Sequence, residues 1–230
     1  MRLHILATGL SGGIGQALEL RTKNHPEWRV TRLLRRPSGP ADIAFDVTWS
    51  ERRIAQALEP VGPVDVLVAL AGADILSPPL RNRPYAERLE ALYAVDIHGT
   101  VKTVRATLPH LVKDGVIILM GWDQAGLGKA GESGELYALA KGALTAYAKS
   151  LALTLMDRAT VYTVAPGWVD TRWGKSLETP RKQRIAARTR AGRWQTPDEV
   201  AQVIEALMTF PRQLSTGQVI YVNRGDVLPS

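Results

Sequence analysis

Short apolar runs alternate with amphipathic stretches along this 230-residue chain. The runs contain few polar positions, as buried strands of a parallel sheet do, and the stretches between them have the apolar spacing of helices. The expected strands are residues 3–7, 29–34, 43–45, 64–70, 116–120, 161–164 and 218–222. The expected helices are residues 13–20, 51–58, 84–112 (one long helix or two abutting ones), 136–156 and 197–208. This order predicts an α/β fold.

The regular alternation predicts a doubly wound, mostly parallel sheet with helices on both faces, because a parallel connection needs a crossover. No repeat, low-complexity stretch or linker interrupts the series, so residues 1–230 are expected to form one domain. Residues 171–196 are the exception, because they are polar and basic and have no strong apolar period. A connection of this length predicts a lid or substrate loop.

The composition narrows the possible chemistry. The chain has no Cys, which excludes a disulfide scaffold, a thiolate metal site and a Cys nucleophile, so redox chemistry would need a bound cofactor. The four His residues show no metal-binding spacing, and no metal is expected. No apolar run reaches the roughly 18 residues of a membrane span, and no export leader precedes the first strand, so we expect a cytoplasmic protein.

The net charge of +7 is unevenly distributed along the chain. Residues 172–193 hold eight basic residues against one acidic residue, residues 21–36 hold six against one, and the remaining chain is net acidic. Two local patches favour anionic small molecules, including an anionic substrate such as a CoA or phosphopantetheine thioester, over nucleic acid, which needs a continuous basic stripe. A solvated cationic loop and a duplex-binding surface stay open as alternatives for residues 172–193.

A glycine-rich turn, TGLSGGIG at residues 8–15, joins the first expected strand to the first expected helix. Glycines in such a turn let backbone N–H groups approach a pyrophosphate, which the partial positive charge of the helix N-terminus stabilises. The turn therefore predicts a dinucleotide site, although a plain tight turn has the same pattern. The residues expected to contact the dinucleotide are Thr8, Gly9, Ser11, Gly13, Ile14 and Gly15.

Two arginines, Arg35 and Arg36, follow the second expected strand, where a dinucleotide site needs a group for the adenosine ribose. An acid at this place binds a free 2′-hydroxyl, whereas arginine suits a 2′-phosphate. The sequence has no acid here and so favours NADP(H) over NAD(H). A solvated pair of arginines at a strand end is the alternative.

Tyr137 and Lys141 lie four residues apart on an expected helix and so share one face. A nearby ammonium group favours the phenolate and lowers the pKa of a Tyr side chain from about 10, which makes the phenol a usable proton donor or acceptor near neutral pH. The spacing alone is weak evidence, because such a pair often arises by chance.

Together with the glycine-rich turn, these residues resemble the short-chain dehydrogenase/reductase family over essentially the whole chain. The turn matches the family's TGxxxGxG pattern, and Tyr137 with Lys141 matches its YxxxK pattern. Residues 46–47 match the position that contacts adenine, residues 71–72 the end of NNAG, and residues 165–171 the PGxxxT segment at the nicotinamide. The cofactor contacts implied there are Asp46, Val47, Ala71, Gly72, Pro166, Gly167, Val169 and Thr171. The resemblance also implies a Rossmann-type subunit, often a homodimer or homotetramer, that reduces carbonyls or oxidises alcohols with NAD(P).

The chain departs from the family pattern at three places. Where the family has a Ser that hydrogen-bonds the substrate oxygen, residues 120–124 read MGWDQ, and residues 69–70 replace the two Asn of NNAG. The Asn behind the catalytic Lys is replaced by Asp96. Asp96 could accept a hydrogen bond from the family's relay water, or it could pair with Lys141 and weaken its effect on Tyr137.

Several residues are candidates to replace the missing Ser. Trp122, Asp123 or Gln124 could donate a hydrogen bond to the substrate, and Gln124 is the least demanding because Asp123 would first need to be protonated. Ser133 lies only four residues before Tyr137 and would need an unusual loop path.

The leading hypothesis is an NADP(H)-dependent oxidoreductase in which Tyr137 gives a proton to a carbonyl oxygen as hydride arrives from the nicotinamide. Lys141 would hold the nicotinamide ribose and lower the pKa of Tyr137, with Asp96 in the proton relay. Trp168 and Trp173 either line the substrate mouth or merely pack. The alternative is an NADP(H)-binding sensor or partner subunit without efficient turnover, because the family's Ser and Asn are missing.

Overall fold

The computed structural model describes residues 1–171, 174, 178–210 and 215–226. Within this part of the chain, seven strands form one parallel sheet in the order β3-β2-β1-β4-β5-β6-β7. The strands are β1 (His4–Thr8), β2 (Arg29–Leu34), β3 (Asp42–Ala44), β4 (Val64–Ala69), β5 (Leu111–Met120), β6 (Ala159–Pro166) and β7 (Gln218–Val222). The α-helices are α1 (Gly13–Thr22), α2 (Glu51–Leu58), α3 (Tyr85–Leu92), α4 (Thr100–Thr107), α5 (Glu132–Thr154), α7 (Thr179–Ala186) and α8 (Pro197–Thr209).

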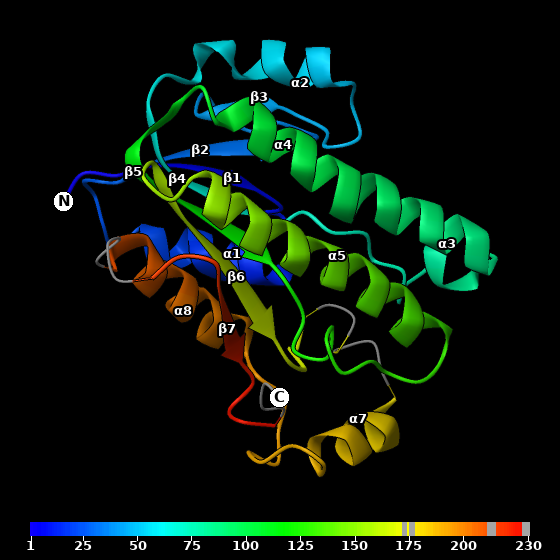
Figure 1. Ribbon diagram of the computed structural model, residues 1–230. Coiled ribbons are helices and arrows are strands. Elements are labelled where there is room, and N and C mark those ends of the chain that lie inside the picture. The colour runs from blue at the N-terminus through cyan, green and yellow to red at the C-terminus, as the bar shows by residue number, and fades with distance from the viewer. Residues whose placement is uncertain (172–173, 175–177, 211–214, 227–230) are drawn as a thin grey trace.

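Helices cover both faces of the sheet (Figure 1). Side chains alternate along each strand, so Leu6 joins a core cluster that includes Leu151 of α5, whereas Ile5 joins a second cluster with Leu18 of α1 and Ile204 of α8. This arrangement confirms the Rossmann-type, doubly wound α/β class that the sequence predicts. None of the helices in the described ranges is long and apolar enough to cross a membrane.

The strand order reverses at β1. Strands β1 and β4 are neighbours in the sheet, although β2 and β3 lie between them in the chain. Thr8 at the end of β1 therefore pairs with Ala69 at the end of β4. Open α/β sheets bind ligands at such a reversal, beyond the carboxyl ends of the strands. The fold thus places the glycine-rich turn and the loop after β4 side by side at a binding edge.

The expected helix at residues 84–112 is divided and shorter in the structure. It consists of α3, a π-helical segment η3 (Tyr93–Gly99) and α4, and it ends at Thr107. Leu111 already pairs with Val64 in the sheet, and the Val64 N–H donates to the His110 carbonyl at 2.8 Å. Strand β5 therefore begins at Leu111 rather than at residue 116, because its first apolar residues fit a helical spacing as well as a strand.

The segment 171–196 leaves the sheet and returns to almost the same place. Val169 pairs with Gln195 in an isolated bridge, and the Gln195 N–H donates to the Trp168 carbonyl at 2.8 Å. Helix α7 lies within this segment, and Pro180 in its first turn is a start signal that the sequence reasoning missed. Residues 172–173 and 175–177 lie outside the described residues, and with them the expectation for Trp173.

Candidate active site

Glycines in the turn from β1 to α1 bring two strand-end loops close together. Gly9 has a positive φ of 73°, and a Cβ there would lie 2.5 Å from the carbonyl carbon of Leu70. A Cβ on Gly15 would lie 2.4 Å from the Gly9 carbonyl oxygen. The Thr8 hydroxyl accepts a hydrogen bond from the Ala71 N–H at 3.3 Å. Larger residues are excluded at both glycines, which leaves a backbone-lined crevice that suits a pyrophosphate.

Two cavities lie along this crevice. The first, of about 490 Å³, lies between the glycine-rich turn, the segment after β3 and the loop after β4. The second, of about 570 Å³, is lined in part by Ser11, Arg35 and Arg36. Ile14 and Gly15 belong to the first turn of α1 and line neither cavity, and Gly13 instead packs against Thr171. The expected cofactor contacts that line the first cavity are Thr8, Gly9, Ser11, Asp46, Val47, Ala71 and Gly72.

The arginine-rich cavity has a charge network that the sequence reasoning missed. Arg32 lies 2.7 Å from Glu19 and 2.5 Å from Asp42, so the carboxylate of Glu19 in the cavity wall is compensated. Within the described residues, neither Arg35 nor Arg36 makes an ion pair, and both are exposed. The cavity therefore keeps positive charge for an anion. No local pattern joins residues 19, 32 and 42, which is why the sequence does not reveal this network.

A third cavity, of about 340 Å³, lies between the first turns of α5 and the segments that follow β5 and β6. Tyr137 and Lys141 both line it, as their helical spacing predicts. The indole of Trp122 packs against Tyr137 with the ring centroids 6.1 Å apart. Pro166 ends β6 and does not line this cavity. The residues contributed by the segment after β6 are Gly167, Trp168, Val169 and Thr171.

Lys141 is held by Asp96 of η3. Its Nζ lies 2.7 Å from Oδ1 of Asp96, and the two side chains are 9% and 1% exposed. The other carboxylate oxygen of Asp96 accepts the Ala73 backbone N–H at 2.7 Å. Of the two arrangements that the sequence leaves open for Asp96, the structure has the pair with Lys141.

The expected lowering of the Tyr137 pKa is wrong in this arrangement. Burial raises the pKa of Tyr137 well above its ordinary value, and the negative charges of Asp96 and Asp74 raise it further. Asp96 neutralises Lys141, so the ammonium group no longer favours the phenolate. The Tyr137 hydroxyl donates to the Ala73 carbonyl at 3.2 Å. Tyr137 is therefore protonated at neutral pH, and its phenol is a weaker acid than an ordinary Tyr side chain.

Two of the candidate donors after β5 do not reach the cavity, which corrects the expectation for Asp123 and Gln124. Trp122 lines the cavity, whereas Asp123 is 2% exposed and lies behind Gly167, where the Asn223 amide donates to it at 3.3 Å. Burial raises the pKa of Asp123 to about 6 against the opposing hydrogen bond from Asn223. The chain turns directly after Trp122, where the Ala125 N–H donates to the Trp122 carbonyl at 3.1 Å, and Gln124 in this turn does not line the cavity.

Known proteins resemble this chain over most of its length. Residues 18–226 match a family model described as enoyl-(acyl carrier protein) reductase. The 3-oxoacyl-[acyl-carrier-protein] reductase FabG of Vibrio cholerae is 30% identical, in an alignment that covers 96% of this chain and 95% of that protein. The chain belongs to the short-chain dehydrogenase/reductase family. As a member of this family, it is an oxidoreductase.

Solved structures share the fold of this chain. ElxO, solved with NADP bound, has a TM-score of 0.81 and 22% identity, and the match covers 98% of this chain and 99% of that one. A 3-ketoacyl-(acyl-carrier-protein) reductase from Brucella melitensis, solved with NADH, has a TM-score of 0.81 and 21% identity, with 98% of each chain covered.

The prediction for Ser133, that it would need an unusual loop path to reach the site, is wrong in this short-chain dehydrogenase/reductase. Helix α5 begins at Glu132 rather than at residue 136, so Ser133 lies one turn before Tyr137 on the same face, and no unusual loop path is needed. Both side chains line the 340 Å³ cavity. Arg88 Nη1 donates to the Ser133 hydroxyl at 3.4 Å. Acidic residues in the first turn, Glu132 and Glu135, were the signal that could have placed the helix start.

The basic segment 171–196 is partly compensated by acids. Lys182 of α7 lies 2.7 Å from Asp170, and Arg193 lies 2.9 Å from Glu199. The ring of Trp168 packs against Trp194 with the centroids 5.2 Å apart, so Trp168 both lines the cavity and packs.

Proposed function

We propose that this oxidoreductase uses NADP(H) to reduce a carbonyl compound, or to oxidise the corresponding alcohol, with Tyr137 as the proton donor or acceptor. The observation that carries the proposal is the cavity in which Tyr137 and Lys141 lie together beside the segment after β6. The FabG relative is named a 3-oxoacyl-[acyl-carrier-protein] reductase, which also supports a carbonyl substrate.

The cofactor site fits NADP(H) in shape and charge. The close approach of Gly9 to the loop after β4 leaves room for a pyrophosphate, and the 490 Å³ cavity beside Asp46 and Val47 would hold the adenosine. Arg35 and Arg36 would hold the 2′-phosphate, because guanidinium groups bind phosphate with charge-assisted hydrogen bonds. When bound, the reduced cofactor supplies the hydride.

In the reducing direction, the protonated phenol of Tyr137 would give its proton to the developing alkoxide, while its raised pKa makes it a weaker acid than an ordinary Tyr side chain. Lys141 would hold the nicotinamide ribose, and Asp96 would keep the Lys141 side chain in place from behind. Ser133 would orient the substrate oxygen, since its hydroxyl accepts from Arg88 and keeps its own proton free to donate.

The experiment is NADPH oxidation by wild-type and Tyr137→Phe protein over a panel of keto compounds. Loss of general acid catalysis is expected to lower kcat by about 10²–10⁴-fold. Tyr147→Phe is a matched control on the same helix, because the described residues offer the buried Tyr147 hydroxyl no hydrogen-bond partner. Equal rates for Tyr137→Phe and wild type would overturn the proposed role of Tyr137.

The cofactor choice is tested in the same assay by comparing NADPH with NADH. Arg35→Ala is expected to raise the KM for NADPH by about tenfold or more while changing the KM for NADH little, because a charge-assisted contact to the 2′-phosphate contributes about 1.5–3 kcal/mol. Arg52→Ala, an exposed arginine on α2, is the control. NADPH binding in calorimetry without turnover on the whole panel would instead favour a binding protein.

A further inference from the structure

The 340 Å³ cavity has an uneven charge balance. Its lining includes two lysines, Lys129 and Lys141, and no acidic residue. Lys141 is neutralised by its buried pair with Asp96. Lys129 lies in the loop before α5, is exposed, and makes no ion pair with any described residue. Among the described residues, therefore, the cavity keeps one cation, Lys129, without a counter-ion.

Lys129 is held against the rim of this cavity by contacts on two sides. Its Nζ lies 5.6 Å from the ring centroid of Trp168, which comes from the segment after β6. Its backbone packs on α5 at Gly134, where a Cβ would lie 2.3 Å from the Lys129 carbonyl oxygen. Only glycine permits this approach. The position of Lys129 is thus tied to the helix that carries Tyr137.

We propose that Lys129 recognises an anionic group, a carboxylate or a phosphate, on the carbonyl substrate. This inference rests on the proposed function, because it assigns a substrate class to the same cavity. The indoles of Trp122 and Trp168 supply the apolar walls for the rest of the molecule, while Lys129 supplies the charge at the mouth. An exposed ammonium group attracts anions in a salt-dependent way, so the preference is strongest at low ionic strength.

Binding of a matched pair of probes tests this inference without turnover. Benzoate and benzamide have the same ring and differ in charge, and calorimetry in low-salt buffer gives the dissociation constant of each. Wild-type protein is expected to bind benzoate more tightly by up to about fivefold, the size of a favourable exposed ion pair. Lys129→Gln is expected to abolish this difference and Lys129→Arg to keep it. Lys113→Gln, an exposed lysine at the start of β5, is the control and should also keep it.

Two results would overturn the inference: equal binding of the charged and the neutral probe by wild type in both pairs, or a preference for the charged probe that survives Lys129→Gln. A second pair, dihydroxyacetone phosphate and dihydroxyacetone, extends the comparison to phosphate, and a preference that depends on Lys129 in either pair supports the inference. The role of Lys129 and the proposed reaction can be contradicted by different results. Reduction of keto compounds without any charge preference contradicts only the role of Lys129, whereas a preference that depends on Lys129, without reduction of any keto compound, contradicts only the proposed reaction.

Discussion

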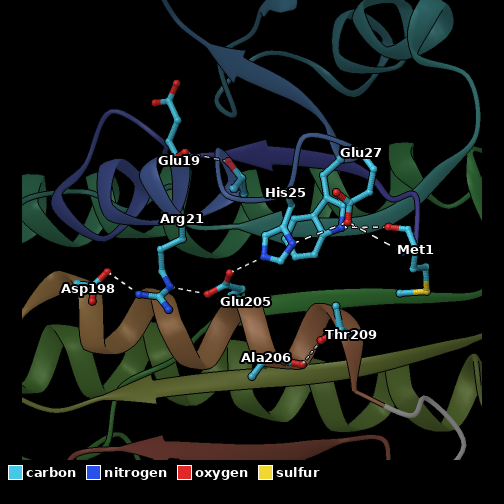
Figure 2. A network of polar contacts seen from close by, with 11 residues as sticks. Met1, Glu19, Arg21, His25, Glu27, Asp198, Glu205, Ala206 and Thr209 are labelled. Atoms are coloured by element: carbon cyan, nitrogen blue, oxygen red, sulfur yellow. Dashed lines mark hydrogen bonds and ion pairs between the residues drawn. The ribbon is translucent and has the colours of Figure 1, made fainter.

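Two ion pairs join distant segments of this protein, and they differ in burial. In the candidate active site, Lys141 and Asp96 are 2.7 Å apart and 9% and 1% exposed. Between α1 and α8, Arg21 and Glu205 are 2.5 Å apart and 23% and 16% exposed, and His25 also contacts Glu205 at 2.7 Å (Figure 2). Both pairs have short distances, but only the first is cut off from water.

The difference in burial gives the two pairs different consequences. Taking both Lys141 and Asp96 out of water costs free energy that their attraction roughly offsets, so this pair is poor evidence of stability. Its effect is electrostatic, because Asp96 raises the pKa of Tyr137 and neutralises Lys141. The Arg21–Glu205 pair keeps contact with water and stabilises the packing of α1 against α8 modestly. The buried pair thus bears on chemistry and the half-buried one on the fold.

Breaking the buried pair is expected to have the largest effect on stability. Lys141→Met leaves the Asp96 carboxylate buried beside one backbone N–H, so the free energy of unfolding should fall by about 3–5 kcal/mol. Urea denaturation measures this loss. Lys149→Met on the same helix is the control, because Lys149 is exposed and its loss should change stability by less than about 0.5 kcal/mol.

The double variant Lys141→Met/Asp96→Asn separates an unpaired charge from a packing defect. It removes both charges, so it should be more stable than Lys141→Met alone, and the cycle of variants measures the coupling between the two side chains. Equal stability of the single and double variants would mean that the Asp96 charge is not what destabilises Lys141→Met.

The sequence predicts these two regions to different extents. The side of α5 that carries Tyr137 and Lys141 follows from local spacing alone. The partner of Lys141 does not, because it depends on where η3 places Asp96 relative to α5. Arg21 and Glu205 are 184 residues apart and no motif links them, so their pairing could not be predicted.

The fold, too, is predictable where the local pattern of apolar residues allows only one structure. Strand β4 (Val64–Ala69) matches its predicted run closely because its residues are apolar except for Asp65. The start of β5 at Leu111 and the start of α5 at Glu132 were missed, because the apolar pattern there fits more than one structure or is absent. The missed start of α5 bears on function, because Ser133 and Tyr137 share a helical face only if the helix begins before Ser133.

Asp123 is as buried as Asp96, but it differs from Asp96 in its partners. Among the described residues, no cationic side chain pairs with Asp123. Burial raises the pKa of Asp123 to about 6 from the ordinary 3.8. Between pH 3.8 and pH 6, therefore, Asp123 is protonated in the folded state but ionised in the unfolded state. Stability contributed by this proton is complete below about pH 4 and lost as the pH rises through about 6. Asp123→Asn should therefore raise the free energy of unfolding by about 3 kcal/mol at pH 8 and little at pH 3.5.

Denaturation of wild type and Asp123→Asn at pH 8 and at pH 3.5 measures the free energy of unfolding of each protein and shows which of the two is the more stable. Asn keeps an oxygen that can accept from the Asn223 amide, so the local hydrogen bond survives the change. Asp157→Asn, at an exposed position, is the control and should leave the two curves alike. A wild type that is the more stable protein at pH 8 would show that the carboxylate of Asp123 is compensated in the folded state.

Replacing Glu205 is expected to change the free energy of unfolding least, and its pKa is shifted in the opposite direction to that of Asp123. Burial alone would raise the pKa of Glu205, but hydrogen bonds from Arg21 and His25 outweigh it, and the pKa is lowered from the ordinary 4.5. The stabilisation is therefore present above about pH 4.5 and lost as the pH falls through the lowered pKa. Glu205→Gln should lower the free energy of unfolding by about 1 kcal/mol at pH 7, and the gap to wild type should narrow in acid. Glu59→Gln, at an exposed position, should change neither value. A gap for Glu205→Gln that is the same at pH 7 and pH 3 would mean that packing between α1 and α8, rather than the charge of Glu205, is lost.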